Sequence, residues 1–255
     1  MTNVTQFQPA PVVSIIVAVY NGAQVIEKTL TSIIGQEYRH KEIIVIDGKS
    51  SDQTWDIVQK FTDHIAYSLS EKDKGIPDAY NKGISAAKGD WIFFLNADDI
   101  FANDQVLSTI FSSQTHDNNI EVLAGSVLST DGRLFNGRFN WKLLIKNTVH
   151  HQAIFYRSKF LRLNPYNTSY RSYGHDHEHN LLIWKHHIRV KYLDCVVANW
   201  ARGGISDMPS WKNYTEEFRV RKNAFGLLGY PFNIFTFLRF FWKRTLLKID
   251  RLYAE

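Results

Sequence analysis

The sequence contains very little cysteine, since Cys195 is the single thiol among 255 residues. A lone cysteine excludes a disulfide within the chain and suits a reducing compartment, so we expect a cytoplasmic protein. Residues 1–11 lack the basic region and apolar core of a secretory signal and are expected to form a short flexible lead. The uncharged run at 223–238 has 16 residues and is interrupted by glycine and proline. A membrane-crossing helix needs about 20 apolar residues, so none is predicted there.

Glycine-rich nucleotide-binding motifs are also missing. A dinucleotide-binding fold shows Gly-x-Gly-x-x-Gly after its first strand, whereas the run Tyr20-Asn21-Gly22-Ala23-Gln24 has one glycine. The sequence has no Walker lysine motif either. These absences argue against a Rossmann dehydrogenase and a P-loop enzyme. Any nucleotide must then be held by side chains and a metal ion.

What the sequence does contain is an alternation of strands and helices over its first 119 residues. Apolar β-branched or aromatic runs predict strands at 12–19, 42–46, 65–69 and 91–95, and helical spacing predicts helices at 26–34, 51–61 and 79–87. This alternation predicts an α/β fold, a Rossmann-like and mostly parallel sheet with helices on both faces. After residue 120 the alternation weakens to strands at 122–128 and 133–139, joined by a turn at Asp131-Gly132.

Two adjacent acids, Asp98 and Asp99, follow directly on the strand at 91–95. Paired carboxylates at the carboxyl end of a buried strand can hold a hard divalent cation, which in turn would hold a diphosphate. Adjacent acids in that position are also common in solvated turns and at helix N-termini. The pair alone therefore leaves both interpretations open.

Four motifs in order favour the metal interpretation, because they resemble those of family 2 glycosyltransferases. They are Val19-Tyr20-Asn21, Ile46-Asp47-Gly48-Lys49-Ser50-Ser51-Asp52-Gln53-Thr54, Asp73-Lys74-Gly75-Ile76-Pro77-Asp78-Ala79-Tyr80-Asn81-Lys82-Gly83 and Asn96-Ala97-Asp98-Asp99. The resemblance covers roughly residues 12–206 and is strongest to bacterial enzymes that build surface polysaccharides such as capsule, O-antigen or exopolysaccharide. It implies the GT-A fold, a nucleotide-sugar donor, and Mn²⁺ or Mg²⁺ as cofactor.

The resemblance also implies roles for individual residues. Asp47 would accept the imino N–H of uracil, which distinguishes uracil from cytosine, and Asp98 and Asp99 would ligate the metal. Donor or acceptor contacts are expected from Asp78, His151, Glu178 and Arg202. Nucleotide contacts are expected from Tyr20, Asn21, Asp47, Asp73, Lys74, Asn96, Ala97 and Asp98. Ordinary structural roles, such as turn residues or surface ion pairs, remain open for several of them.

The sequence departs from the family pattern at three places. Asn96 stands where the first acid of Asp-x-Asp is usual, Tyr80 stands where arginine is frequent, and His175 replaces an acidic neighbour. Asn96 can still hydrogen-bond a ribose hydroxyl but brings no charge, so a weaker or more Mn²⁺-dependent site is expected. A phosphate contact at Tyr80 is placed in doubt.

The catalytic base is expected at Asp176, because Tyr173-Gly174-His175-Asp176 precedes a helix as the family's late acidic motif does. Inversion at an anomeric carbon needs one carboxylate to take the acceptor proton, and Glu178 is the reserve candidate. The interleaved His175, His177 and His179 also suggest a zinc cluster. Alternate residues of a helix do not share a face, so these histidines are instead expected at the polar surface.

The last segment, 209–255, is expected to be a basic amphipathic helical tail after a nucleotide-sugar half at 1–119 and an acceptor and catalytic-base half at 120–208. Residues 211–255 carry nine Lys/Arg against four Asp/Glu, which accounts for the whole net charge of +5. Such a tail suits the surface of an anionic membrane, and a dimer or interdomain helix would show the same pattern. Nucleic acid is disfavoured, because the aromatic residues cluster with aliphatic ones.

These observations predict an inverting enzyme that moves a hexose or N-acetylhexosamine from a UDP-sugar to a hydroxyl of a growing cell-surface glycan. The acceptor is expected to be polyprenyl-diphosphate-linked, and the enzyme peripheral on the cytoplasmic face of the inner membrane. A non-catalytic sugar-nucleotide-binding partner and a nucleotidyltransferase are the alternatives. Metal acids on an α/β scaffold suit the nucleotidyltransferase, and the lack of a glycine-rich basic loop opposes it.

Overall fold

The computed structural model describes residues 10–112, 117, 119–170, 174–201 and 211–252. Its first half contains four parallel strands in the order β3-β2-β1-β4. They are β1 (Val13–Val19), β2 (Lys41–Asp47), β3 (Tyr67–Ser70) and β4 (Trp91–Phe94). The parallel, doubly wound arrangement expected from the strand-helix alternation is therefore confirmed, and the carboxyl ends of these strands lie along one edge of the sheet.

The second half extends the same sheet with mixed strand directions. Strand β8 (Ile154–Arg157) pairs antiparallel with β4, and β6 (Val122–Ser129) pairs antiparallel with β8. Strand β9 (Val190–Trp200) lies parallel to β6, while the short strands β5 (Ile100–Phe101) and β7 (Leu134–Phe135) join at β9 and β6. One nine-stranded sheet thus runs through both expected halves, whose division at residue 119 stays a prediction.

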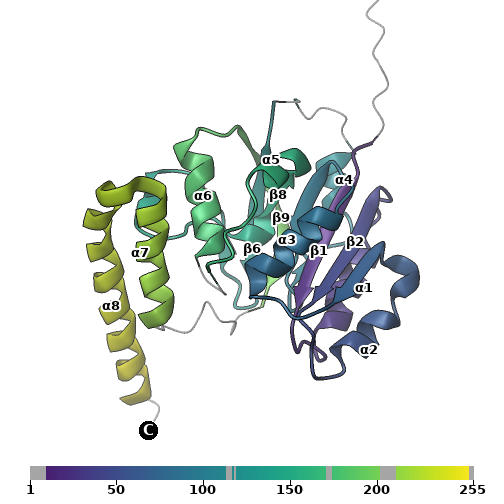
Figure 1. The fold of residues 1–255 in the computed structure, drawn as a ribbon, viewed down its shortest axis with the longest axis horizontal. Helices are drawn as coiled ribbons and strands as arrows, with labels where there is room; N and C mark the ends of the chain where they lie inside the picture. The colour runs from purple at the N-terminus through teal and green to yellow at the C-terminus, as the bar shows by residue number, and fades with distance from the viewer. Residues whose placement is uncertain (1–9, 113–116, 118, 171–173, 202–210, 253–255) are drawn as a thin grey trace, which may run out of the picture.

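Helices cover both faces of this sheet, and strand alternation decides which core each residue joins. Ile15 and Phe93 pack with α1 (Ile26–Ile34), α2 (Thr54–Gln59) and α4 (Val106–Phe111). Their neighbours Ile16 and Phe94 pack on the opposite face. That face is covered by α3 (Ile76–Ala86), α5 (Ser158–Leu163) and α6 (His175–Lys185). Figure 1 shows the two helical layers on either side of the sheet.

The sequence-based assignment differs from the structure mainly after residue 100. Helices α4 and α5, each of six residues, were not expected, and the strand expected at 133–139 is reduced to Leu134–Phe135. Gly137 packs directly against the backbone of Thr148, so the chain leaves the sheet at that point. Before the tail, the described residues contain three 3₁₀ turns: η1 (Thr62–His64), η2 (Trp141–Leu144) and η3 (His151–Ala153).

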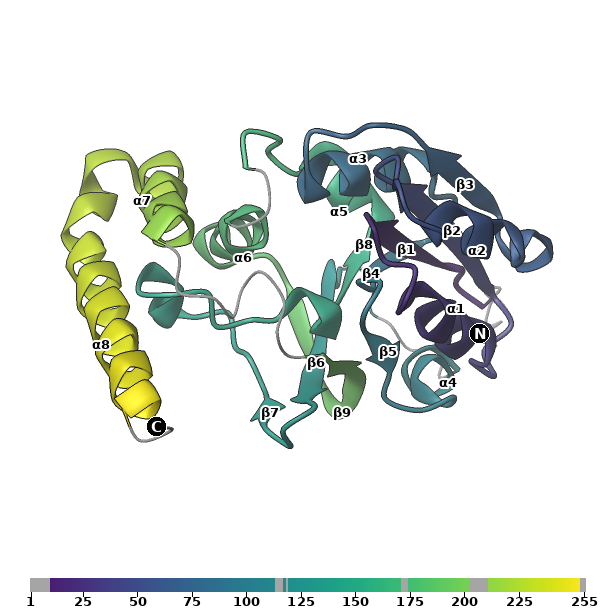
Figure 2. The same ribbon diagram turned by 90° about the horizontal axis from the view of Figure 1, so that it is seen from below.

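The tail forms two helices, α7 (Trp211–Phe225) and α8 (Asn233–Leu252), joined by the 3₁₀ segment η4 (Gly226–Phe232). Trp211 at the start of α7 contacts Phe240 of α8, and Arg221 near the end of α7 contacts Asn233 at the start of α8, so the helices run antiparallel. Figures 1 and 2 show this hairpin at one end of the molecule, with α6 between it and the sheet.

The hairpin also contains the one segment of the described chain whose length and composition would allow it to cross a membrane. That segment, Tyr214–Thr245, has a mean hydropathy of 1.2 over its most apolar window. It reverses direction at η4, so it does not form one straight helix. We therefore describe it as a hairpin with an apolar surface.

Candidate active site

The ends of β1 and β2 are joined by short hydrogen bonds from polar side chains. Asn21 has a φ of 50°, a left-handed conformation that asparagine tolerates better than most residues. Its side-chain oxygen accepts from the Ser51 backbone N–H at 2.9 Å, and its own N–H donates to Ser50 Oγ at 2.8 Å. Asn21 therefore holds the ends of β1 and β2 together, and this structural role does not depend on a bound ligand.

Asp47 lies at the end of β2 and is fully buried. Its carboxyl group accepts hydrogen bonds from the Ser50 N–H and hydroxyl and from the Ser70 hydroxyl, the last at 2.6 Å. These three donors come from its own turn and from β3. Uracil would have to share or displace them, so recognition of the base by Asp47 stays a prediction.

Gly48 brings several of the expected nucleotide-binding residues together. A Cβ atom at Gly48 would lie 2.6 Å from an Asp73 carboxyl oxygen and 3.4 Å from the Tyr20 ring. Tyr20 is 66% exposed at the end of β1. An exposed aromatic ring beside a carboxyl group can stack on a flat base while the acid binds ribose hydroxyls.

The charged residues before α3 have separate roles. Lys74 is exposed, and its backbone N–H donates to Asp78 at 3.1 Å. Asp78 also lies 3.6 Å from Lys82, so it stabilises the first turn of α3 and pairs with a lysine. Ala97, which follows β4, accepts from the Thr29 hydroxyl at 2.8 Å through its carbonyl. Ligand contacts by Lys74, Asp78 and Ala97 stay predictions.

Asn96 lies at the centre of a buried polar cluster. The Tyr80 hydroxyl donates to Asn96 Oδ1 at 2.7 Å, and His151 Nε2 lies 3.3 Å from both that oxygen and the Tyr80 hydroxyl. Tyr80 is 1% exposed, and burial raises its pKa well above the ordinary value, so the phenol keeps its proton and acts as a donor. Tyr80 and Asn96 are two of the positions at which the sequence departs from the family pattern, and the structure shows that they are hydrogen-bonded to each other.

His151 is neutral in this cluster. Burial, followed by the neighbouring His150, lowers its pKa from 6.5 to about 3. A neutral imidazole can donate or accept one hydrogen bond near the donor sugar but adds no positive charge for a phosphate. The donor contact expected of His151 is therefore more consistent with the sugar than with a phosphate, and it stays a prediction.

The two adjacent acids have different surroundings. The Asp98 side chain is exposed, and partial desolvation by the surrounding protein raises its pKa. Asp99 is fully buried, and its carboxyl group accepts from the Gln152 side chain and from the Ala201 N–H, the latter at 2.8 Å. Burial and then the Asp98 charge raise the pKa of Asp99 to about 8. The pair expected to share a metal thus consists of one accessible and one enclosed acid.

The described residues contain no group of three or more His, Cys, Asp or Glu side chains placed to hold a metal. Mg²⁺ and Mn²⁺ in phosphate-transfer sites are commonly held by one or two carboxylates together with substrate phosphates and waters. The exposed Asp98 carboxyl group fits that requirement. Direct ligation by Asp99 stays a prediction that its buried hydrogen bonds do not favour.

Asp176 occupies the first turn of α6, half-buried beside several imidazoles. Burial acts to raise its pKa, but the facing His175, His151 and His177 outweigh it and hold the pKa below the ordinary value. Asn147 also donates to Asp176 Oδ2 at 2.8 Å. The carboxylate is therefore ionised at neutral pH and able to accept a proton.

Electrostatic contacts connect Asp176 with the acidic motif. Tyr80 lies within reach of the charges on Asp176, Asp99 and Asp98. The cluster thus brings together side chains from α3, from the end of β4, from η3 and from the start of α6.

Two expected site residues remain, Glu178 and Arg202. Glu178 faces the tail, where it accepts from Asn223 of α7 at 2.8 Å and from Tyr170 at 3.0 Å, so the structure does not join it to the cluster around Asp176. Its role as reserve base therefore stays a prediction without geometric support. Arg202 lies outside the described residues.

The three histidines of α6 are buried, which corrects the expectation that they lie at the polar surface. His175, His177 and His179 are 4%, 1% and 3% exposed. His177 Nε2 lies 2.7 Å from the Leu143 carbonyl, and His179 stacks on Tyr166 with ring centroids 4.2 Å apart. They are core residues because α6 is packed between the sheet and α7, so both of its faces are covered.

Sequence reasoning missed three residues of the site. Tyr80 was treated as a departure, and Asn147 was not assigned a role, although it bonds to Asp176. Gln152 stands beside His151 in a pair that resembles the family's His-Gln pair, but its bond to Asp99 was not expected.

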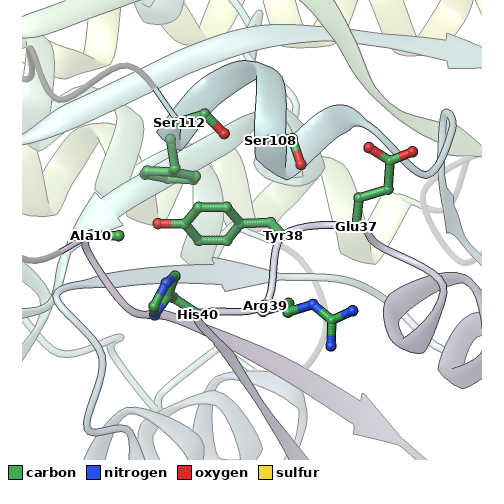
Figure 3. Close-up of a pocket in the computed structure, with 8 residues that line it drawn as sticks. Ala10, Glu37, Tyr38, Arg39, His40, Ser108 and Ser112 are labelled. Atoms are coloured by element: carbon green, nitrogen blue, oxygen red, sulfur yellow. The ribbon is translucent and has the colours of Figure 1, made fainter.

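A separate hollow of about 380 Å³ lies at the opposite edge of the sheet, where β2 begins. It is lined by Ala10, Glu37, Tyr38, Arg39, His40, Ser108, Phe111 and Ser112. Figure 3 shows the Tyr38 ring extending across it, with Glu37 and Arg39 pointing away. The Tyr38 hydroxyl donates to the Pro11 carbonyl, so the ring closes the core at this edge. None of the expected site residues lies there.

Residues 14–185 match the family described as Glycosyl transferase family 2. The chain belongs to this family. A PGL/p-HBAD biosynthesis glycosyltransferase of Mycobacterium tuberculosis is 34% identical to this glycosyltransferase over 207 residues, which cover 78% of this chain and 80% of that one. The Escherichia coli enzyme named UDP-Glc:alpha-D-GlcNAc-diphosphoundecaprenol beta-1,3-glucosyltransferase WfaP is 38% identical over 104 residues, which cover 40% and 41% of the two chains.

Solved structures show the fold independently. The glycosyltransferase resembles Staphylococcus aureus TarS in complex with UDP-GlcNAc with a TM-score of 0.67 at 19% identity, covering 84% of this chain and 65% of that one. It resembles a mannosyltransferase from Pyrobaculum calidifontis in complex with GDP-Man and Mn²⁺ with a TM-score of 0.62 at 18% identity, covering 96% and 81%. The expected GT-A fold is confirmed, and the protein is a glycosyltransferase of glycan biosynthesis.

Proposed function

We propose that this glycosyltransferase moves a hexose or N-acetylhexosamine from a UDP-sugar to a hydroxyl of a lipid-linked surface glycan, with inversion at the anomeric carbon. The observation that carries the proposal is the convergence of an accessible acid, Asp98, and an ionised acid, Asp176, around the Tyr80, Asn96 and His151 cluster. The relative WfaP is named for transfer from UDP-Glc to a diphosphoundecaprenol-linked sugar, which supports the donor and acceptor classes.

In the proposed reaction, Asp176 takes the proton of the acceptor hydroxyl as that oxygen forms its bond to the anomeric carbon. The bond between the anomeric carbon and the diphosphate oxygen breaks, and UDP leaves from the opposite face, which inverts the configuration. Asn96 and His151 are neutral and hydrogen-bonded, so they orient donor hydroxyls without adding charge.

A divalent cation at Asp98 would neutralise the diphosphate and ease its departure. Mn²⁺ in the Pyrobaculum calidifontis complex supports a divalent cation in this fold. Asp98 is the residue that we assign as its direct protein ligand, because its side chain is exposed at the end of β4. Asp99 holds the neighbouring backbone through Gln152 and Ala201.

We further propose that the α7–α8 hairpin binds an anionic membrane and so brings the enzyme to its lipid-linked acceptor. Leu238, Phe241 and Trp242 of α8 are 61%, 60% and 68% exposed, and helical spacing places them near one another. The helix carries five basic residues and one acidic residue between positions 233 and 252. Exposed apolar side chains among cations suit the interface of an anionic leaflet.

Donor specificity is tested by thermal unfolding of the purified protein with UDP or GDP, each with and without Mn²⁺. Stabilisation by UDP that requires Mn²⁺, with none by GDP, is expected, because a ligand that binds only the folded state raises the unfolding temperature. Stabilisation by GDP alone would refute the UDP assignment. Release of UDP that depends on added lipid-linked saccharide separates a transferase from a non-catalytic binding protein.

Membrane binding is tested by co-sedimentation with phosphatidylglycerol vesicles and with phosphatidylcholine vesicles. We expect binding to the anionic vesicles alone, and loss of binding in the double variant Leu238→Ser, Trp242→Ser. The matched control is Leu163→Ser, because Leu163 is 71% exposed but lies on α5. A dimer that the double variant converts to a monomer, with no vesicle binding by either protein, would show that the hairpin joins two chains instead.

A further inference from the structure

Asn147 lies between Asp176 and the next turn of α6. Its Nδ2 donates to Asp176 Oδ2 at 2.8 Å, and its Oδ1 accepts from Asn180 Nδ2 at 2.9 Å and from the Val149 N–H at 3.4 Å. Asn180 follows Asp176 by four residues, so both side chains project from one face of the helix. Because Oδ1 is taken by two donors, the amide of Asn147 can present only its N–H₂ group to Asp176.

Several titratable groups face the same carboxylate. Burial lowers the pKa values of the histidines among them and raises those of the tyrosines, so the tyrosines stay protonated. These groups are His175, His177 and His179 of α6, His151 of η3, Tyr80 of α3, Tyr156 of β8, and Tyr166. The direct side-chain donor to Asp176 is therefore Asn147.

The backbone that carries Asn147 is held by the tail hairpin. Arg221 is fully buried and donates to the Leu144 carbonyl at 2.6 Å and to the Ile145 carbonyl at 2.8 Å. Arg239 of α8 donates to the same Ile145 carbonyl at 2.9 Å. Both arginines also form ion pairs with the buried Glu217. One residue, Lys146, separates Ile145, whose carbonyl accepts from both arginines, from Asn147.

We infer that Asn147 is a positioning residue that orients the Asp176 carboxylate and favours its ionised form, and that the α7–α8 hairpin fixes Asn147 through Arg221. The inference rests on the proposed role of Asp176 as the base. Asp176 Oδ1 accepts from the His177 N–H and Oδ2 accepts from Asn147, so each oxygen keeps a lone pair for the acceptor hydroxyl. The α7–α8 hairpin then has two roles, because it fixes the residue that orients Asp176 and its exposed surface binds the membrane.

The test is Asn147→Asp, which keeps the shape of the side chain and an acceptor for Asn180. It replaces the donor to Asp176 by a second carboxylate, and like charges raise the pKa of one member of such a pair. We expect the acidic limb of the pH profile of kcat to move up by about one pH unit or more, with KM for the donor changed less than threefold. The control is Asn140→Asp, because Asn140 caps η2 through its side-chain oxygen, which aspartate also supplies.

Difference infrared titration of the carboxyl band, assigned with Asp176→Asn, measures the same shift without any substrate. A shifted band in Asn147→Asp and in Asn147→Ala, with an unchanged band in Asn140→Asp, is expected. An unshifted band in folded Asn147→Asp would overturn the positioning role, even if transfer is slow. If the wild-type protein transfers no sugar, the proposed function is refuted. The infrared titration still tests whether Asn147 positions Asp176, because it needs no substrate.

The part played by the hairpin is tested with Arg221→Met in the full chain. If the hairpin fixes Asn147, the Asp176 band shifts in the same direction as in Asn147→Ala, in protein that circular dichroism shows to be folded. A folded Arg221→Met protein with an unshifted band would overturn the link between the hairpin and the base. Should that variant unfold, Arg239→Gln serves for the same measurement, because it removes one of the donors to Ile145 and keeps Arg221.

Discussion

The two sides of the proposed active site, which we call the nucleotide side and the base side, are built in different ways. On the nucleotide side, Asn21, Asp47 and Asp73 are positioned by turns at the ends of neighbouring parallel strands, through bonds to residues such as Ser50, Ser51 and Gly75. On the base side, Asp176 is surrounded by groups from η3, α3, α6 and β8, and its positioning amide is held by the tail. The first arrangement is local in sequence and the second is not.

This difference predicts where the site is sensitive to distant changes. Polar groups in a strand-end turn find partners within a few residues or on the adjacent strand, so their geometry follows from the sheet. A partly buried polar cluster made from several segments depends on every segment, because each unpaired donor or acceptor costs free energy. We therefore expect the base side to lose function when remote contacts are removed, and the nucleotide side to keep binding UDP.

The largest effect is expected from Asp176→Asn, which preserves shape and removes the proton acceptor. Loss of general base catalysis should lower kcat by about 10²- to 10⁴-fold, with Mn²⁺-dependent binding of UDP unchanged. Single-turnover transfer and isothermal titration with UDP measure the two quantities. Transfer at the wild-type rate would show that another group is the base.

The next effect is on stability, through the buried ion pair of the hairpin. Arg221→Met leaves Glu217 paired with Arg239 but removes buried hydrogen bonds to Glu217 and to the Leu144 and Ile145 carbonyls, which should cost about 1–3 kcal/mol in the free energy of unfolding. Urea denaturation of the full chain checks the value. The exposed pair of Arg133 and Asp131 offers the control, and Arg133→Met should change stability by less than about 1 kcal/mol.

The adjacent acids provide a matched comparison at the end of β4. Asp98→Asn should weaken Mn²⁺-dependent UDP binding by about tenfold or more with little change in stability, because Asp98 is exposed. Asp99→Ala should instead cost about 1–3 kcal/mol of stability, because it leaves the Gln152 side chain and the Ala201 N–H without their acceptor. If Asp98→Asn instead lowered stability and Asp99→Ala instead weakened Mn²⁺-dependent UDP binding, the roles assigned to Asp98 and Asp99 would have to be exchanged.

The smallest effect at any one pH is expected from the buried histidines. Burial lowers the pKa of His151 to about 3 and that of His179 to about 4, both from 6.5, so the unfolded chain binds more protons than the folded one below pH 6.5. The free energy of unfolding should therefore fall as the pH is lowered from 6.5 toward 4. His179→Phe keeps the ring on Tyr166 and should reduce this slope in urea titrations.

The strand-helix alternation up to residue 100 was predicted correctly because each strand there carries its own apolar run and ends at a glycine or polar turn. The catalytic half was harder to predict. Helix α6 contains His175, His177, Asn180 and two acids within its first six residues, a composition typical of a solvated helix. It is buried only because the sheet and α7 cover it, so its histidines enter the core as neutral rings.

The sequence by itself determined the family, the parallel sheet and the row of polar residues at its carboxyl edge, because these depend on period-two burial and on turn chemistry within short segments. Only the tertiary structure decided that Asp98 is accessible while Asp99 is enclosed, that Tyr80 and Asn96 are partners, and that the tail holds the backbone carbonyls of Leu144 and Ile145. Those properties arise from contacts between residues far apart in the chain. Their free energy depends on which polar groups burial leaves together, which no local pattern specifies.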